Sequence, residues 1–232
     1  MEMHTLSSKF LPRTMALVCG LTALLGLDAC RPPRPASLNG SESPPKAEQY
    51  LEILSTWTRD SSIYQVFDQK LFISATYHSP EFRRAFAVAF PDIYGHGGAI
   101  TKRELVDLTG DVENFHNFFI TLFTPEVKWN DLAKNDSIWR ITLVADDEVS
   151  VEPTEILPIK VDENLKAVYP HIDHFDKCYL IRFPSTDMMQ RLVITPKTKH
   201  FKIRIASALG SSEMAWKLSP GQKKKPHPQE ND

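Results

Sequence analysis

The spacing of hydrophobic and polar positions changes near residue 112, and the change separates two kinds of predicted structure. Before this point, apolar residues recur every three or four positions, as on one face of a helix. One helix is predicted from Ala47, and a second from Pro80, where Ser79 is a favourable N-cap. A third is predicted after Thr101, where Glu104 completes a capping box. The first two apolar faces consist of Tyr50, Ile53, Leu54 and Trp57, and of Phe82, Ala85, Phe86, Ala89 and Phe90.

A hairpin is predicted between the first two helices. Residues 63–67 and 71–77 are strand-like, and the polar residues 68–70 between them suggest the turn. The second helix is expected to end at Pro91, because proline cannot continue a helical hydrogen-bond pattern.

After residue 112 the pattern becomes one of short strands. Residues 115–123 are apolar at both odd and even positions, which indicates a strand buried on both sides or one packed against a helix. Further strands are predicted at 138–144, 155–161, 179–183, 192–194, 201–206 and 212–218. This pattern favours an α+β protein that is mostly β, with an antiparallel β-sandwich of Ig-like architecture preceded by a helix and hairpin segment.

The two ends of the chain lack such periodicity. Residues 31–46 contain five prolines and no aromatic residue, which predicts an extended, disordered tether. The tail, residues 219–232, carries three lysines at 223–225, typical of a solvated terminus or of weak attraction to anionic lipid or glycan. The expected organisation is therefore residues 1–29, the segment 30–46, a mixed segment 47–112, a β-sandwich 113–218 and the tail.

Residues 1–30 have the composition of an export signal. Lys9 and Arg13 precede an apolar run, residues 14–27, which is shorter than the roughly 20 residues that a membrane-spanning helix needs. The run closes on Leu27, Asp28, Ala29 and Cys30. These four residues resemble the lipobox of bacterial lipoproteins, with Asp28 at a position that is usually small or uncharged.

The resemblance implies cleavage between Ala29 and Cys30 and acylation of Cys30. Several acyl chains on one cysteine would hold the protein firmly at a membrane. Arg31 would follow the lipidated residue, and it is compatible with sorting to the outer membrane, facing the periplasm or the cell surface. An ordinary secretory signal or a plain membrane anchor are the alternatives. The resemblance ends near residue 30, and the rest of the chain is only loosely similar to uncharacterised envelope lipoproteins.

Composition bounds the remaining possibilities. Hydrophobic residues make up 42% of the chain and charged residues 24%, as in an ordinary globular protein. The net charge of −2 gives no reason to expect a nucleic-acid partner. Of three cysteines, Cys19 lies in the signal and Cys30 in the lipobox, so no disulfide is expected within the mature chain. Cys178 lies in a strand-like run and is interpreted as a small buried group, with a nucleophile as the alternative.

The densest polar cluster lies between Tyr169 and Asp176. His171, Asp173 and His174 are candidate ligands for zinc or another divalent metal, together with Asp176. The alternative is a polar loop in which the aspartates cap turns.

Three weaker candidates lie elsewhere. The acidic residues 146–148 suggest either a calcium site or a solvated turn. Ser79 or Ser74 could pair with His78 or His96 near Asp92, although no G-x-S-x-G elbow is present. Trp129 is either a core residue or an exposed binding anchor.

Three functions are therefore considered. The first is a lipid-anchored envelope protein with a structural or partner-binding role, without catalysis and without a cofactor; its partners would be the membrane, through Cys30, and an envelope protein. The second is a metal-binding protein or metal-dependent hydrolase that uses His171, Asp173 and His174. The third is a protein that binds a small apolar or lipid ligand between the helices and the sandwich.

Overall fold

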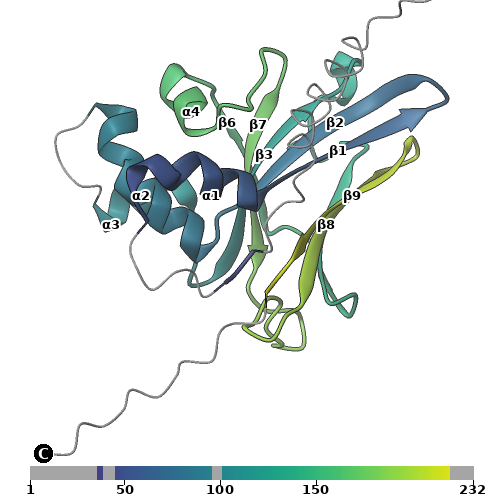
Figure 1. Cartoon of the computed structure of the whole chain (residues 1–232). Helices are drawn as coiled ribbons and strands as arrows, with labels where there is room; N and C mark the ends of the chain where they lie inside the picture. The colour runs from purple at the N-terminus through teal and green to yellow at the C-terminus, as the bar shows by residue number, and fades with distance from the viewer. Residues whose placement is uncertain (1–35, 39–44, 96–100, 220–232) are drawn as a thin grey trace, which may run out of the picture. The chain divides into compact units, whose positions relative to one another are not determined.

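The computed structural model describes residues 36–38, 45–95 and 101–219, which belong to one compact unit that begins at Arg34 (Figure 1). The predicted signal with its lipobox, Cys30, most of the tether and residues 220–232 lie outside the described residues. The prediction of an extended, disordered tether over residues 31–46 is wrong at Ala36, which is buried, forms a bridge with Leu218 and donates its amide to the carbonyl oxygen of Lys217 at 3.2 Å. Within the described part, no helix is both long and apolar enough to cross a membrane.

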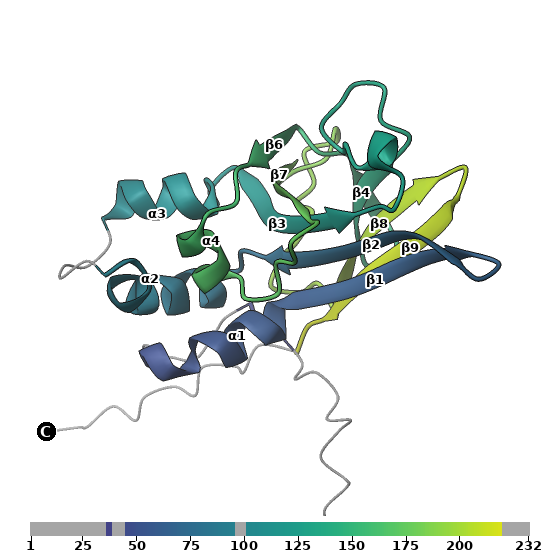
Figure 2. The same ribbon diagram turned by 90° about the horizontal axis from the view of Figure 1, so that it is seen from above.

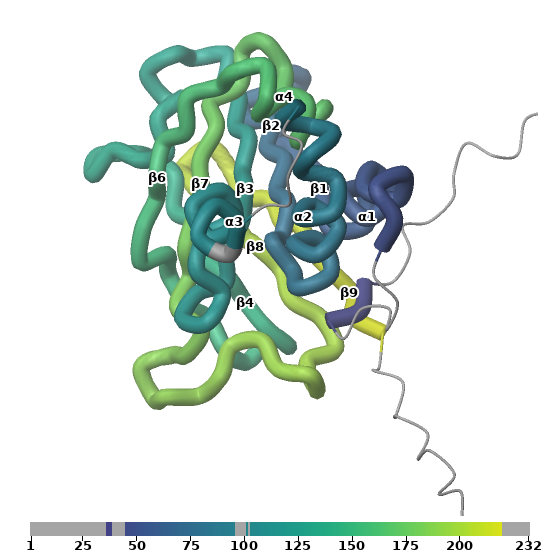
Figure 3. Tube along the Cα trace, turned by 90° about the vertical axis from the view of Figure 1, so that its left-hand side faces the viewer, coloured from purple at the N-terminus to yellow at the C-terminus, as the bar shows by residue number. Residues whose placement is uncertain are grey.

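Two antiparallel sheets form the framework. The first has the strand order β1-β2-β3-β7-β6, which Figure 3 shows from one side. The second has the order β5-β4-β8-β9. This confirms the predicted class, an α+β protein that is mostly β and sandwich-like. The strand bounds are β1 Thr58–Gln65, β2 Asp68–Tyr77, β3 Phe115–Phe123, β4 Arg140–Ala145, β5 Val149–Val151, β6 Glu155–Ile159, β7 Lys177–Pro184, β8 His200–Ser207 and β9 Gly210–Lys217.

The predicted hairpin belongs to the same sheet as the later strands. Tyr77 of β2 pairs with Phe118 of β3, so residues from both predicted segments, 47–112 and 113–218, build the five-stranded sheet. The hairpin turn lies at Val66 and Phe67, not at residues 68–70 as predicted. The pairing places Leu71 and Ile73 in the core, and this register leaves the two apolar residues at the tip.

The two sheets pack through aromatic side chains. The ring centroids of Tyr77 and Phe201 lie 5.1 Å apart, and those of Phe118 and Trp216 lie 5.7 Å apart. The indole N–H of Trp216 donates to the carbonyl oxygen of Trp57 at 3.0 Å. All five residues are buried, so this layer is the main core between the sheets.

The helices cover one end of the opposite face of the five-stranded sheet, beyond which the β1–β2 hairpin extends (Figure 2). The ring of Phe119 on β3 stacks on Tyr169 with centroids 3.8 Å apart, which confirms that β3 is buried on both faces. The helices are α1 Tyr50–Trp57, preceded by a 3-10 turn η1 at Ala47–Gln49, α2 Pro80–Tyr94, α3 Lys102–Thr109 and α4 Glu163–Val168, with a second 3-10 turn η2 at Val127–Trp129.

Local sequence signals locate the helix starts but not every end. Ser79 accepts a hydrogen bond from the Phe82 amide at 3.0 Å, and Thr101 and Glu104 form the predicted capping box. However, α2 continues through Pro91 to a left-handed Gly95. The predicted strand at residues 192–194 is reduced to an isolated bridge at Leu192.

Candidate functional site

The residues predicted as metal ligands form a turn. The Asp176 carboxylate accepts a hydrogen bond from the Asp173 amide at 2.8 Å, and the Asp173 carboxylate accepts one from the His174 amide at 2.6 Å. The side chains of Asp173 and His174 are exposed. Among the described residues, no three histidine, cysteine, aspartate or glutamate side chains come together as metal ligands. The structure therefore supports the turn-capping interpretation of this loop.

His171 turns inward instead. Its ring lies against Tyr169, with centroids 5.9 Å apart, and against Phe119 on β3, at 6.3 Å. Its Nε2 atom is buried and has no hydrogen-bond partner. Burial lowers the pKa of His171, and the nearby carboxylate of Asp60 opposes that shift. The neutral imidazole of His171 therefore has a buried ring nitrogen, Nε2, that makes no hydrogen bond.

The strand register places four polar residues in one row across the sheet. Asp60 on β1 pairs with Ser74 on β2, Ser74 pairs with Thr121 on β3, and Thr121 pairs with Cys178 on β7. Directly opposed residues in antiparallel strands point to the same face. The row therefore faces the side on which Phe119, two positions from Thr121, meets the helical layer and His171.

Two members of this row are buried without a partner. Ser74 is 2% exposed and Thr121 is 0% exposed, yet neither Ser74 Oγ nor Thr121 Oγ1 makes a hydrogen bond. A buried polar atom without a partner costs about 1–3 kcal/mol, so native structures rarely leave one unpaired. Two adjacent cases, with His171 Nε2 as a third, indicate a place where a water molecule or a ligand completes the structure.

Asp176 adds a carboxylate beside this row. Burial raises its pKa, and the charge of Asp173 acts in the same direction, while the Asp173 amide and the Thr121 hydroxyl oppose the shift. Thr121 lies next to the carboxyl but makes no hydrogen bond of standard geometry with it. We call Asp60, Ser74, Thr121, His171 and Asp176 the sheet-face site.

Aromatic residues continue this face beyond the polar row. Phe72 on β2 pairs with Phe123 on β3, two positions from Ser74 and Thr121 respectively. The ring of Phe123 lies 6.2 Å from that of Phe175, which is 67% exposed. The sheet-face site is thus bordered by apolar surface that is open to solvent.

Cys178 has the character of a structural residue. Its side chain is free and buried. Burial, aided by the charge of Asp176, raises the pKa of its thiol to about 12. Because the nucleophile is the thiolate, this environment disfavours covalent chemistry.

His78 is held in a buried network and makes no contact with a serine hydroxyl. Its Nδ1 lies 2.7 Å from the carbonyl oxygen of Thr109, and its Nε2 lies 2.8 Å from the hydroxyl of Tyr169. A carbonyl can only accept, so Nδ1 carries the proton and the tyrosine hydroxyl donates to Nε2. Burial lowers the pKa of His78 to about 4, which keeps it neutral. Ser79 serves as the helix cap, Asp92 lies within α2 and His96 lies outside the described residues.

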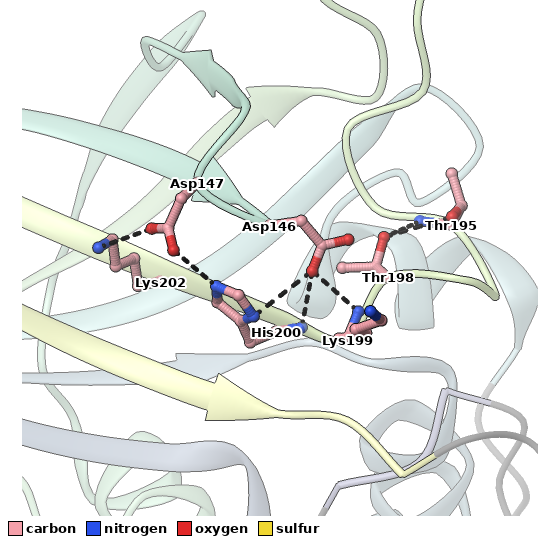
Figure 4. A network of polar contacts seen from close by, with 7 residues as sticks. All are labelled: Asp146, Asp147, Thr195, Thr198, Lys199, His200 and Lys202. Carbon is pink, nitrogen blue, oxygen red and sulfur yellow. Dashed lines mark hydrogen bonds and ion pairs between the residues drawn. The ribbon is translucent and has the colours of Figure 1, made fainter.

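The acidic residues 146–148 form the β4–β5 turn rather than a calcium loop (Figure 4). Asp146 and Asp147 both have positive φ angles, 48° and 60°. Asp146 Oδ1 accepts hydrogen bonds from the amides of Lys199, at 2.9 Å, and His200, at 3.0 Å. Asp147 pairs with His200 at 3.0 Å and with Lys202 at 2.9 Å. These bonds stabilise a turn conformation that is unfavourable for residues other than glycine, so this network has a structural role.

Trp129 is half-buried, and its carbonyl oxygen accepts a hydrogen bond from the Trp139 indole at 2.8 Å. A hollow of about 450 Å³ lies next to it, between residues 130–133 and the ends of β6 and β7. Its two lysines, Lys160 and Lys177, are exposed. One buried, unpartnered atom, Oδ1 of Asn130, borders this hollow, whereas the sheet-face site holds two such hydroxyls on directly paired strands and Nε2 of His171.

Sequence reasoning found part of the sheet-face site. His171 and Asp176 were identified by their polar cluster, and Ser74 was considered only as a nucleophile. Asp60 and Thr121 were missed. The sequence does contain one indication of Thr121. It is a hydroxyl residue on a face of β3 where the residues two positions before and after it, Phe119 and Phe123, are both aromatic.

Comparison with known proteins gives no further guide. No protein-family model, no curated protein and no solved structure matches the chain. The function is therefore argued from the geometry of the site.

Proposed function

We propose that this chain is a lipid-anchored protein of the bacterial cell envelope whose folded domain binds a ligand or partner at the sheet-face site. The observation that carries the binding role is the pair of buried, unpartnered hydroxyls of Ser74 and Thr121. The unpartnered Nε2 of His171 adds to it, on a ring that lies 6.3 Å from Phe119 on the same face of β3. Binding would satisfy groups that the folded chain leaves without partners.

A binding role suits these groups better than catalysis. Acyl transfer by a serine requires a base within hydrogen-bonding distance of the hydroxyl, and Ser74 Oγ has no such contact. Cys178 is held as a thiol by its raised pKa. Recognition needs only groups of fixed position, and a β-sheet supplies these because its backbone hydrogen bonds fix the register.

The anchor proposal rests on the lipobox resemblance of Leu27, Asp28, Ala29 and Cys30, which lie outside the described residues. Because Ala36 is buried and forms a bridge with Leu218 of the folded domain, the span from Cys30 to Ala36 would link anchor and domain, a reach of at most about 20 Å at roughly 3 Å per residue. Arg31 is compatible with placement at the outer membrane.

The test of the whole proposal uses the native, full-length chain. Wild type and Cys30→Ser are compared for membrane association, and wild type and Thr121→Val for partners captured by crosslinking in intact cells. We expect Cys30→Ser to leave the membrane fraction and Thr121→Val to remain there with reduced capture. Unchanged membrane association of Cys30→Ser would contradict the anchor. Identical capture by wild type and Thr121→Val would contradict the binding site.

A further inference from the structure

We infer that the sheet-face site takes a cationic amine, a primary ammonium group carried on a short apolar stem. This inference rests on the proposed binding role and adds the chemical class of the ligand. It combines three observations: carboxylates without an ion pair, buried groups that can accept hydrogen bonds, and neighbouring aromatic rings.

The site carries negative charge that no ion pair compensates. Asp60 and Asp176 both belong to it, and no ion pair joins either of them to a cation within the described ranges. Arg59, which precedes Asp60 in the chain, lies on the opposite face of β1 and donates to the carbonyl oxygen of Ala215 at 3.0 Å. Lys177 likewise lies on the opposite face of β7, because successive residues of a strand point to opposite faces and Cys178 belongs to the row. An anionic ligand would therefore meet two carboxylates that no ion pair neutralises, with only the longer-range attraction between Arg59 and Asp60 to offset their charge.

The unpartnered atoms can all accept hydrogen bonds. Ser74 Oγ and Thr121 Oγ1 carry lone pairs, and their side chains are 98–100% removed from solvent, since 2% and 0% remain exposed. His171 Nε2 accepts in the neutral imidazole whose proton is on Nδ1. An ammonium group carries three donors and no acceptor, so it matches a set of acceptors better than a hydroxyl or a carboxylate does.

The aromatic border suits the stem of such a ligand. Phe123 follows Thr121 on the same face, and Phe175 precedes Asp176 in the loop. Long amines bury their methylene groups on apolar surface while the charged head meets polar groups. The faces of aromatic rings also attract cations within about 6 Å. The exposed fraction of Phe175, 67%, leaves this border accessible.

The experiment is an NMR titration of the folded chain from residue 31 onward, with n-butylammonium as probe and with 1-butanol and butyrate as matched neutral and anionic probes. We expect n-butylammonium to shift the amide signals of Ser74, Thr121 and Asp176 saturably, and the other two probes to bind at least about tenfold more weakly. Asp176→Asn should weaken n-butylammonium about tenfold. Asp136→Asn, which removes one exposed carboxylate elsewhere, should leave binding unchanged.

Each outcome decides a different point. Equal binding of 1-butanol, or tighter binding of butyrate, would overturn the amine inference but leave a binding site on the sheet face. Shifts that are equal in Asp176→Asn and wild type would also overturn it. No saturable shift by any probe would mean that water alone fills the site, and both the inference and the binding role would then fail.

The source of the amine is separated by two further probes. A short peptide with one lysine and blocked ends carries the same butylammonium group on a backbone, whereas 1,4-diaminobutane is a free small amine. Binding of the peptide at least as tight as that of n-butylammonium would assign the site to a lysine side chain of a partner protein. Binding of the diamine with exclusion of the peptide would assign it to a soluble amine.

Discussion

Ser74 and Thr121 lie directly opposite each other on β2 and β3, and neither buried hydroxyl has a hydrogen-bond partner. The next residue of β2 on the same face, Thr76, does have a hydrogen-bond partner. Thr76 is equally buried, and its hydroxyl lies 2.8 Å from that of Thr58, which in turn donates to the carbonyl oxygen of Leu54. The sheet therefore contains matched hydroxyls, one pair satisfied and one pair not.

This contrast predicts opposite effects of one substitution. Thr121→Val removes an unpartnered hydroxyl, so without ligand the free energy of unfolding should stay equal or rise by up to about 1 kcal/mol. Thr76→Val removes the hydroxyl that donates to Thr58, so it should lower the free energy of unfolding by about 1 kcal/mol. Urea unfolding of both variants measures the difference. A loss in Thr121→Val as large as that in Thr76→Val would mean that a bound water already satisfies Thr121.

The buried histidines predict loss of stability in acid. His78 has an ordinary pKa of 6.5 and a folded-state pKa of about 4, so between these values the unfolded chain binds the proton and the folded chain does not. The contribution of neutral His78 is complete above pH 6.5 and is lost as the pH falls towards 4, on the order of 3 kcal/mol at about 1.4 kcal/mol per pKa unit. Burial also lowers the pKa of His116, so this residue adds to the loss of stability in acid.

Denaturant unfolding of wild type and His78→Gln between pH 7 and pH 4, the window set by these pKa values, checks this. We expect the variant to be less stable at neutral pH, because Thr109 and Tyr169 lose their partner, and its stability to vary less with pH. Parallel curves for the two proteins would show that His78 is not the group that titrates.

The β4–β5 turn predicts a graded series at one position. Asp146→Ala removes the acceptor for two backbone amides and keeps the unfavourable positive φ, so it should cost about 1–2 kcal/mol. Asp146→Asn retains an acceptor oxygen and tolerates this φ, and it should cost less than half as much. Thermal or urea unfolding ranks the variants. Equal losses would show that the charge, and not the hydrogen bonds, stabilises the turn.

The hairpin tip predicts a stabilising substitution. Val66 has a φ of 58°, which is rare for a β-branched residue, and it is 90% exposed, so it gains little from packing. Val66→Gly should raise the free energy of unfolding by about 1 kcal/mol. Phe67→Gly is the control, because Phe67 is also exposed but has no positive φ, and it should be neutral or destabilising. A loss in Val66→Gly equal to that in Phe67→Gly would contradict the strain.

Local signals explain which parts of the fold could be predicted. The starts of α2 and α3 depend on caps within three residues, Ser79 and Thr101, and both were predicted. The two-sided burial of β3 was predicted because its apolar residues occupy both parities. The β1–β2 turn was placed wrongly because Val66 and Phe67 have strand propensity, whereas residues 68–70 are polar. The short helix α4, capped by Asp162, was not predicted, since six residues give too little periodicity.

The site required information that no local pattern contains. Ser74 and Thr121 are neighbours only through the register of β2 and β3, two strands separated by two helices in the chain. His171 and Asp176 stood out because they are close in sequence, but their cluster suggested a metal. The pairing of distant strands decides that His171 points inward while His174 is exposed.

The binding role is tested most directly by linking ligand to stability at the unpartnered hydroxyls. Unfolding of wild type and Thr121→Val is measured with and without n-butylammonium at about ten times its Kd for wild type. Mass action predicts that wild type gains about 1.4 kcal/mol and that Thr121→Val gains markedly less. No gain in either protein would contradict the amine inference, and equal gains in the two proteins would contradict a ligand site at Ser74 and Thr121.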